Sequence, residues 1–103
     1  MAELKLTTKN FEKEVLQSKI PVLVDFYAQW CRPCQMLAPV IKELAEELKG
    51  KVKVTKLDVD KNQSLAAKYK VMSVPTLILF KNGQEIKRII GLRSKEELKK
   101  ELI

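Results

Sequence analysis

Two cysteines separated by two residues are the part of this sequence best suited to chemistry. Cys31 and Cys34 are the only cysteines among 103 residues, and they stand where an apolar run gives way to a predicted helix. A thiol at the first turn of a helix is favoured as the thiolate, because unpaired backbone N–H groups and the helix dipole are positive there. A Cys-x-x-Cys pair can also open and close a disulfide while the fold stays intact. The spacing therefore predicts thiol–disulfide exchange, with Cys31 as the attacking sulfur.

A structural disulfide and half of a zinc site are the alternatives for this pair. Zinc needs about four ligands, and the sequence has no histidine and no third cysteine. Two cysteines are also too few for a secreted disulfide scaffold. We therefore expect no metal and no separate cofactor, and a redox couple formed by Cys31 and Cys34 in a reducing cytoplasm.

Two further side chains are candidates for handling protons. Asp25 stands within a continuous apolar run, where desolvation would raise the pKa of its carboxyl group and suit it to carry a proton for Cys34. A strand-end carboxylate that reaches solvent or a cation is the alternative. Lys56 shares a strand face with Val54, so it is a candidate partner of the Asp25 carboxylate, or it extends to solvent.

The whole chain has the size of one domain, residues 1–103, and its 46% hydrophobic content is typical of a packed globule. The net charge of +7 raises the question of a nucleic-acid partner. Lysines alternate with glutamates in the predicted helices, which is typical of solvated helix faces, so we expect no nucleic acid and a positive field that steers acidic protein partners. Without a membrane-length apolar run or a signal-like start, we expect a cytoplasmic monomer with no membrane partner.

The elements that must position these residues follow from apolar periodicity and turn signals. The predicted strands are residues 4–6, 22–27, 52–57, 76–80 and 84–90. The predicted helices carry Phe11 to Leu16, Leu37 to Leu48, Leu65 to Tyr69 and Leu98 to Leu102. Strands joined through helices should run parallel, and Asn82-Gly83 should turn the last strand back antiparallel. The prediction is an α/β chain in the order β-α-β-α-β-α-β-β-α, with a central mixed sheet of about five strands flanked by about four helices.

Caps and prolines mark the ends of these helices. Candidate N-caps of the first helix are Thr7, Thr8 and Asn10. Pro33 suits the first turn of the second helix, whereas Pro39 lies inside it and should kink it. Ser94 and Glu97 form a predicted capping box for the last helix.

The motifs together resemble the thioredoxin family. The run Val24-Asp25-Phe26-Tyr27-Ala28-Gln29-Trp30-Cys31, followed by Pro33 and Cys34, is similar to the active-site strand and loop of that family. Val74-Pro75-Thr76, Phe80-Lys81-Asn82-Gly83 and Gly91 follow in the same order and at similar spacing. The resemblance covers nearly the entire chain. It implies a thioredoxin fold and a protein disulfide reductase that is itself rereduced by a thioredoxin reductase-type donor.

The resemblance also implies roles for the residues around the cysteines. Cys31 would attack a substrate disulfide, and Cys34 would resolve the mixed disulfide that forms. Asp25 matches the buried aspartate of the family, and Lys56 matches a lysine that lies near it.

A substrate surface is implied beside the disulfide. Pro75 resembles the cis-proline of the family, which would let Val74 present backbone groups to an extended substrate. Trp30 is expected to shield the disulfide and offer a flat contact surface, with burial in the core as the alternative. Gly91 is expected to complete the rim, because a glycine lets another backbone approach closely.

The Trp-Cys-Arg-Pro-Cys motif departs from the usual family motif at one position. Arg32 stands where the family has glycine, and with Pro33 it is expected to tune the redox potential. A cation that favours the Cys31 thiolate stabilises the dithiol and makes the disulfide more oxidising. Two alternatives to a reductase follow: an oxidase or isomerase that uses a more oxidising couple, and a non-catalytic module that binds partners on the same surface.

Overall fold

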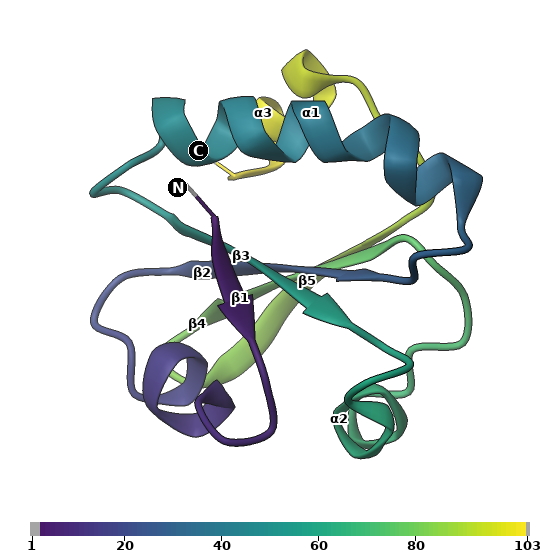
Figure 1. The fold of residues 1–103 in the computed structure, drawn as a ribbon. Helices are drawn as coiled ribbons and strands as arrows, with labels where there is room; N and C mark the ends of the chain where they lie inside the picture. Colours follow the sequence, from purple (N-terminus) through teal and green to yellow (C-terminus); the bar gives the residue numbers. More distant parts are fainter. Residues whose placement is uncertain (1–2, 103) are drawn as a thin grey trace.

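The computed structural model describes residues 3–102, and its elements follow the predicted order (Figure 1). The strands are β1 (Leu4–Leu6), β2 (Val22–Tyr27), β3 (Lys53–Asp58), β4 (Thr76–Lys81) and β5 (Gln84–Ile90). The helices are η1 (Glu12–Leu16), α1 (Arg32–Glu47), α2 (Gln63–Lys68) and α3 (Lys95–Leu102). β3 starts and ends one residue later than the predicted strand 52–57. α2 starts two residues before the helix predicted around 65–69.

The five strands form one mixed sheet in the order β1-β3-β2-β4-β5. β3 pairs in parallel with both β1 and β2, whereas β4 runs antiparallel to β2 and to β5. α1 and α3 cover one face, and η1 and α2 cover the other (Figure 1). This arrangement confirms the predicted α/β class and thioredoxin-type architecture.

The central strand β2 is buried from both sides. Leu23 packs in the cluster beneath α1 and α3, whereas Val24 and Phe26 pack in the cluster beneath η1 and α2. Because side chains alternate along a strand, burial on both faces gives a nearly continuous apolar run. Asp25 is the polar exception, and its alternation with Leu23 points it toward α1.

The predicted turn signals between elements are confirmed. Asn82 and Gly83 both have positive φ, at 53° and 79°, as the two-residue turn between β4 and β5 requires. The Ser94 N–H donates to Glu97 Oε1, and the Glu97 N–H donates to Ser94 Oγ, so the capping box starts α3. α1 continues through Pro39, and Figure 1 shows its amino-terminal turns bending away from the line of the rest.

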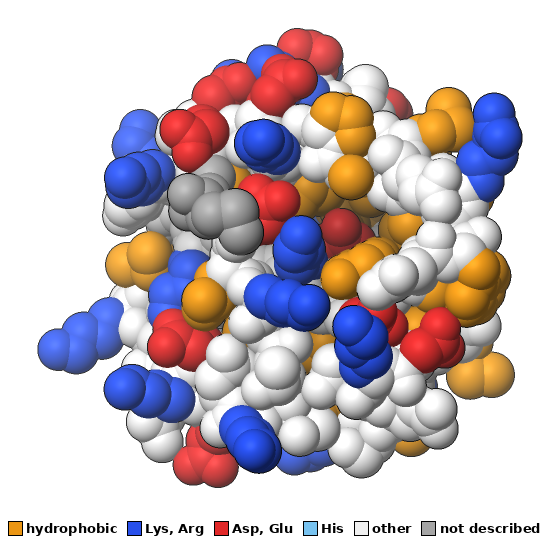
Figure 2. All heavy atoms as spheres, in the orientation of Figure 1, with side chains coloured by type: hydrophobic (Ala, Val, Ile, Leu, Met, Phe, Trp, Pro, Cys, Tyr) orange, Lys and Arg blue, Asp and Glu red, His pale blue; other side chains and the backbone are white. Residues whose placement is uncertain are grey.

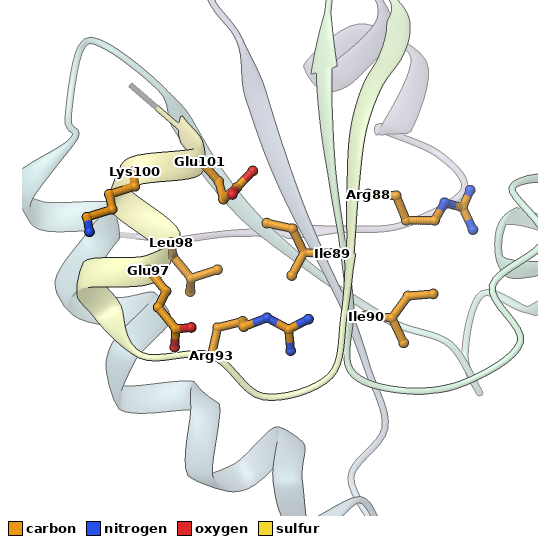
Figure 3. Close-up of a pocket in the computed structure, with 8 residues that line it drawn as sticks. All are labelled: Arg88, Ile89, Ile90, Arg93, Glu97, Leu98, Lys100 and Glu101. Carbon is orange, nitrogen blue, oxygen red and sulfur yellow. The ribbon is translucent and has the colours of Figure 1, made fainter.

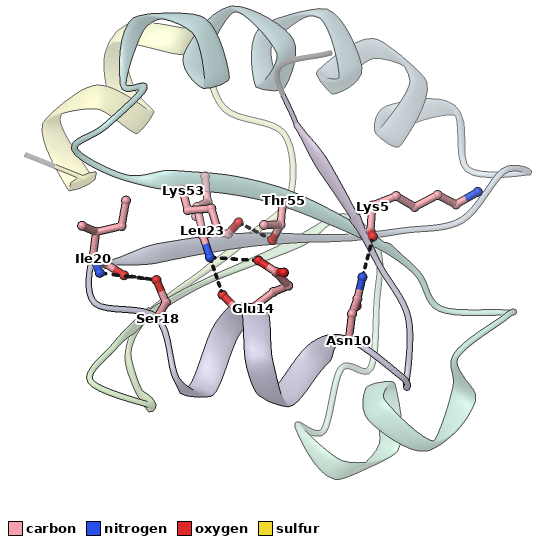
Figure 4. Close-up of polar contacts among 8 residues, drawn as sticks. All are labelled: Lys5, Asn10, Glu14, Ser18, Ile20, Leu23, Lys53 and Thr55. Atoms are coloured by element: carbon pink, nitrogen blue, oxygen red, sulfur yellow. Dashed lines mark hydrogen bonds and ion pairs between the residues drawn. The ribbon is translucent and has the colours of Figure 1, made fainter.

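The first helix is a five-residue π-helix rather than the expected α-helix. The Gln17 N–H donates to the Glu12 carbonyl, which is the π spacing. Lys53 of β3 donates to the Glu14 carbonyl at 2.9 Å and to its carboxylate, as Figure 4 shows, so a side chain replaces a main-chain donor there. The predicted N-caps of this helix are wrong: its N-cap is Phe11, with no side-chain cap bond, and Thr7 Oγ1 instead accepts from the Lys9 N–H within the preceding turn.

Candidate active site

Cys31 and Cys34 form a disulfide at the junction of β2 and α1. Both residues are buried, at 3% and 4% exposure. Cys31 is the N-cap of α1, and the backbone N–H of Cys34 donates to Cys31 Sγ at 3.1 Å. A donor directed at this sulfur, at the positive end of a 16-residue helix, favours negative charge on it.

The two residues between the cysteines lie on the surface. Arg32 and Pro33 are exposed and form the first turn of α1. Pro33 fits there because its missing N–H has no partner to lose in a first turn. The Arg32 charge is therefore close to the sulfurs in sequence but is screened by solvent.

Asp25 lines a small cavity behind the disulfide. The cavity has a volume of about 70 Å³ and is bounded by Glu3, Asp25, Tyr27, Cys34, Ala38, Ile41 and Lys56. Asp25 is 5% exposed, and its Oδ1 atom is buried without a hydrogen-bond partner among the described residues. Burial is the main cause that raises the pKa of this carboxyl group from 3.8 to about 7, while Lys56 lowers it and Glu3 raises it. A carboxyl group of this kind exchanges protons near neutral pH.

Lys56 lies beside Asp25 in the sheet, but its ion pair is with another residue. Asp25 and Lys56 are register partners of β2 and β3. The Lys56 ammonium is 3.9 Å from Glu3 Oε1. Sequence reasoning missed Glu3, which stands one residue before the predicted first strand, so no strand pattern placed it beside Lys56.

The segment before β4 faces the outer side of the disulfide. The Val74–Pro75 peptide bond is cis, as the resemblance implies. Cys31 Sγ lies 3.7 Å from the Val74 carbonyl oxygen. The Gly91 N–H donates to the Pro75 carbonyl at 3.0 Å, and Gly91 has φ +95°, a conformation that side chains rarely adopt. Glycine therefore permits this backbone contact.

Trp30 lies on the surface next to the disulfide and not in the core. It is 71% exposed, and its indole N–H donates to Asp60 Oδ2 at 2.9 Å. A groove of about 150 Å³ runs beside it, lined by Trp30, Val59, Val71, Met72, Ser73 and Val74. Met72 in this groove is 91% exposed. The Asp60 partner fixes the indole, and sequence reasoning did not identify it.

A larger pocket of about 360 Å³ lies away from the cysteines, between β5 and α3. In Figure 3, Leu98 of α3 faces Ile89 of β5 across it, while the Glu97 side chain points toward Arg93. Glu97 already accepts the Ser94 N–H of the helix cap, and Arg88 is bonded to Glu85. No sulfur lines this pocket, so we place the chemistry in the smaller cavity, which Cys34 lines.

Residues 3–102 contain no group of three or more histidine, cysteine, aspartate or glutamate side chains placed to hold a metal ion. No helix in this part of the chain has the length and apolar character needed to cross a membrane. The redox centre is the chain's own disulfide, and exchange at a disulfide requires no bound cofactor.

Known proteins with the same features identify the family. The family model for thioredoxin matches residues 2–103. A thioredoxin of Rickettsia felis is 52% identical over 93 residues, which cover 90% of this chain and 89% of that protein. A thioredoxin of Mycobacterium tuberculosis is 52% identical over 101 residues (98% and 87%), and one of Staphylococcus aureus is 52% identical over 98 residues (95% and 92%). The chain belongs to the thioredoxin family of thiol–disulfide oxidoreductases.

Proposed function

We propose that this chain reduces protein disulfides with Cys31 as the attacking thiolate and Cys34 as the resolving thiol. The observation that carries the assignment is the Cys34 backbone N–H directed at Cys31 Sγ, at the start of α1. This donor and the helix dipole stabilise a thiolate at Cys31. Cys34 instead lines the cavity that contains Asp25, which suits it to lose and regain a proton.

The proposed reaction has two balanced exchange steps. The Cys31 thiolate attacks one sulfur of the substrate disulfide, so that bond breaks, a mixed disulfide forms and the other substrate sulfur leaves as a thiolate. Cys34 then passes its proton to Asp25, and its thiolate attacks the Cys31 sulfur. The second substrate sulfur leaves as a thiolate. The substrate has gained two electrons, and the chain holds the Cys31–Cys34 disulfide.

Asp25 serves as the proton carrier in this proposal. Its pKa of about 7 leaves both the acid and the carboxylate populated near neutral pH. The carboxylate accepts the Cys34 proton when the substrate is released. The acid returns a proton to the Cys34 sulfur when a donor opens the disulfide.

The surface around Cys31 is the proposed substrate site. An extended substrate chain would pair with the backbone of Val74, whose carbonyl is 3.7 Å from Cys31 Sγ. Trp30 and Met72 supply exposed apolar contacts beside it. The backbone hydrogen bond from Gly91 to Pro75 links the two segments beside this substrate site.

The wider biological setting is also part of the proposal. We propose one domain over residues 1–103 that works as a cytoplasmic monomer, carries electrons from a thioredoxin reductase-type donor and helps maintain cell redox homeostasis. Basic side chains are spread over the face in Figure 2, while acidic ones gather over α1. Lys95 bonds to Glu43 and Glu47 between α3 and α1. These exposed pairs support solvated helix faces rather than a nucleic-acid or membrane surface.

Reduction of insulin by dithiothreitol, followed as turbidity, tests this function. We expect the wild type to accelerate the reaction and Cys31→Ser to lose the acceleration, because the attacking sulfur is gone. Wild-type protein without activity would contradict the proposal and favour a binding module. A strongly oxidising equilibrium with glutathione would instead favour an oxidase or isomerase.

A further inference from the structure

A second carboxyl group, from Glu3, lines the cavity that contains Asp25 and Cys34. The Glu3 side chain is 16% exposed, and its Oε2 atom is buried without a hydrogen-bond partner among the described residues. Asp25 Oδ1 is in the same condition. Burying an acceptor without a donor costs free energy, so packing gives no reason to place both carboxyl groups here.

Strand register brings Lys56 and Asp25 to this cavity, and Glu3 reaches it from just before β1. β3 lies between β1 and β2, with Lys56 beside Lys5 on one side and beside Asp25 on the other. Glu3 stands one residue before β1, and its contact with Lys56 at 3.9 Å places it on the face of the sheet that carries Lys56. Glu3, Lys56 and Asp25 therefore gather on the face covered by α1. Figure 2 shows a hollow on this side of the molecule, where acidic and basic side chains meet.

One ammonium group serves both carboxyl groups. Lys56 Nζ lies 3.9 Å from Glu3 Oε1. Its charge lowers the pKa of Asp25, whereas the charge of Glu3 raises it, and both act on a carboxyl group already raised by burial. A cation held toward Glu3 stabilises the Asp25 carboxylate less than one that can approach it freely.

The other polar groups of the cavity do not change charge near neutral pH in the oxidised protein. Tyr27 of β2 lines the cavity, and burial raises the pKa of its phenol above the ordinary value, which already lies well above neutral pH. Cys34 of α1 is held in the disulfide and does not titrate. Lys5 is the exposed neighbour of Lys56 in β1, and an exposed lysine is a cation at pH 7. The group left to exchange protons near neutral pH is the Asp25 carboxyl group.

We propose that Glu3 is a positioning residue for the redox reaction, which competes with Asp25 for the Lys56 ammonium and so sets how readily Asp25 exchanges a proton with Cys34. The inference rests on the proposed role of Asp25 as proton carrier. With Lys56 drawn toward Glu3, Asp25 keeps its proton to a higher pH. It can then protonate the Cys34 sulfur when a donor opens the disulfide at neutral pH.

The test follows the titration of the Asp25 carboxyl carbon by NMR in the oxidised protein. In Glu3→Gln we expect the midpoint to move to lower pH by about 0.5 to 1 unit, because the variant loses a repulsive charge and releases Lys56. The pH dependence of the rate at which dithiothreitol reduces the Cys31–Cys34 disulfide should move by the same amount. Glu14→Gln is the matched control, because it also removes a partner of a β3 lysine, Lys53 at 3.1 Å, but lies outside the cavity. It should leave the midpoint unchanged.

Measuring the effect of Glu3→Gln in a Lys56→Gln variant separates competition for Lys56 from direct charge repulsion between Glu3 and Asp25. The shift caused by Glu3→Gln should be smaller when Lys56→Gln is already present. An unmoved midpoint in Glu3→Gln, or the same shift in both backgrounds, would overturn the inference.

Asp25→Asn distinguishes this failure from that of the proposed function. If Asp25→Asn retains the inflection of the dithiothreitol profile near pH 7, the proton-carrier role fails whatever Glu3 does. If Asp25→Asn loses the inflection while Glu3→Gln leaves it in place, the Glu3 inference alone fails.

Discussion

Cys31 and Cys34 occupy different surroundings although only two residues separate them. Cys31 caps α1 and faces the Val74 carbonyl, whereas Cys34 lines the Asp25 cavity. In the proposed mechanism the first sulfur meets the substrate and the second exchanges protons inside the protein. The chemistry at this scale thus depends on which side of the disulfide each sulfur faces.

Replacement of Asp25 should stabilise the protein above neutral pH. Between pH 3.8 and about 7 the folded protein holds a proton at Asp25 that the unfolded chain has lost, so the free energy of unfolding falls as the pH rises through this window. At about 1.4 kcal/mol for each pH unit, the difference reaches about 4 kcal/mol. We expect oxidised Asp25→Asn to be more stable than the wild type by up to about this amount at pH 8, in urea unfolding.

The same comparison at low pH is the control for Asp25. Near pH 4 the wild-type carboxyl group is protonated in the folded state, so the stability gap should nearly close. Unfolding free energies that differ by the same amount at both pH values would show that Asp25 has no raised pKa.

Arg32→Gly should make the disulfide less oxidising. We expect the Arg32 guanidinium to favour the Cys31 thiolate, and because Arg32 is exposed, we expect its contribution to be within about 1 kcal/mol. For a two-electron couple this corresponds to a potential more negative by about 10 to 20 mV in the variant. Equilibration with glutathione measures the change, and added salt should reduce it. Identical potentials at low salt would refute the role of Arg32.

Sequence reasoning at the residue scale reached what depends on local chemistry. The Cys31 and Cys34 pair and the buried position of Asp25 follow from spacing and from an apolar run. The contacts of Glu3 with Lys56 and of Asp60 with Trp30 could not be predicted in this way, because each joins segments far apart in the sequence. Such partners become visible only when strand order and register are known.

At the scale of the elements, turns and caps determine where the site residues lie. The β4–β5 turn contacts a distant segment: a Cβ on Gly83 would lie 3.0 Å from the carbonyl oxygen of Leu16, the last residue of η1. Gly50, after α1, has similar φ but open space around it. The two glycines therefore share a backbone requirement and differ in their surroundings.

Gly83→Ala should destabilise the protein more than Gly50→Ala. Both alanines must adopt positive φ, which costs about 1 to 2 kcal/mol. Only Gly83→Ala adds a contact with rigid backbone, so we expect its loss to exceed that of Gly50→Ala by about 1 kcal/mol or more. Urea unfolding of both variants measures the difference, and equal losses would contradict the packing of this turn against Leu16.

The elements show where periodicity succeeds and where it fails. The hairpin at Asn82-Gly83 and the capping box at Ser94 are predicted because their signals are local. The π-helix η1 is not predicted from the sequence, because its unusual hydrogen-bond spacing accompanies a tertiary hydrogen bond from Lys53 to the Glu14 carbonyl. An apolar pattern of only five residues does not distinguish helix types.

At the scale of the whole molecule, a sheet covered by helices on both faces carries the redox centre at the carboxyl end of its central strand, β2. Buried apolar clusters pack on the two faces of β2, while Trp30 and Met72 are exposed beside the disulfide. The net charge is +7, and basic side chains are spread over the face shown in Figure 2. Trp30 and Met72 thus give the protein exposed apolar surface beside its disulfide.

Trapping of a mixed disulfide with a protein substrate tests the division of roles between the two sulfurs most directly. Cys34→Ser keeps the attacking sulfur but cannot resolve the adduct, so mass spectrometry should find the substrate held on Cys31. The matched variant Cys31→Ser should form little adduct under the same conditions. If Cys31→Ser instead traps substrate on Cys34 as readily, the proposed assignment of attack to Cys31 is wrong.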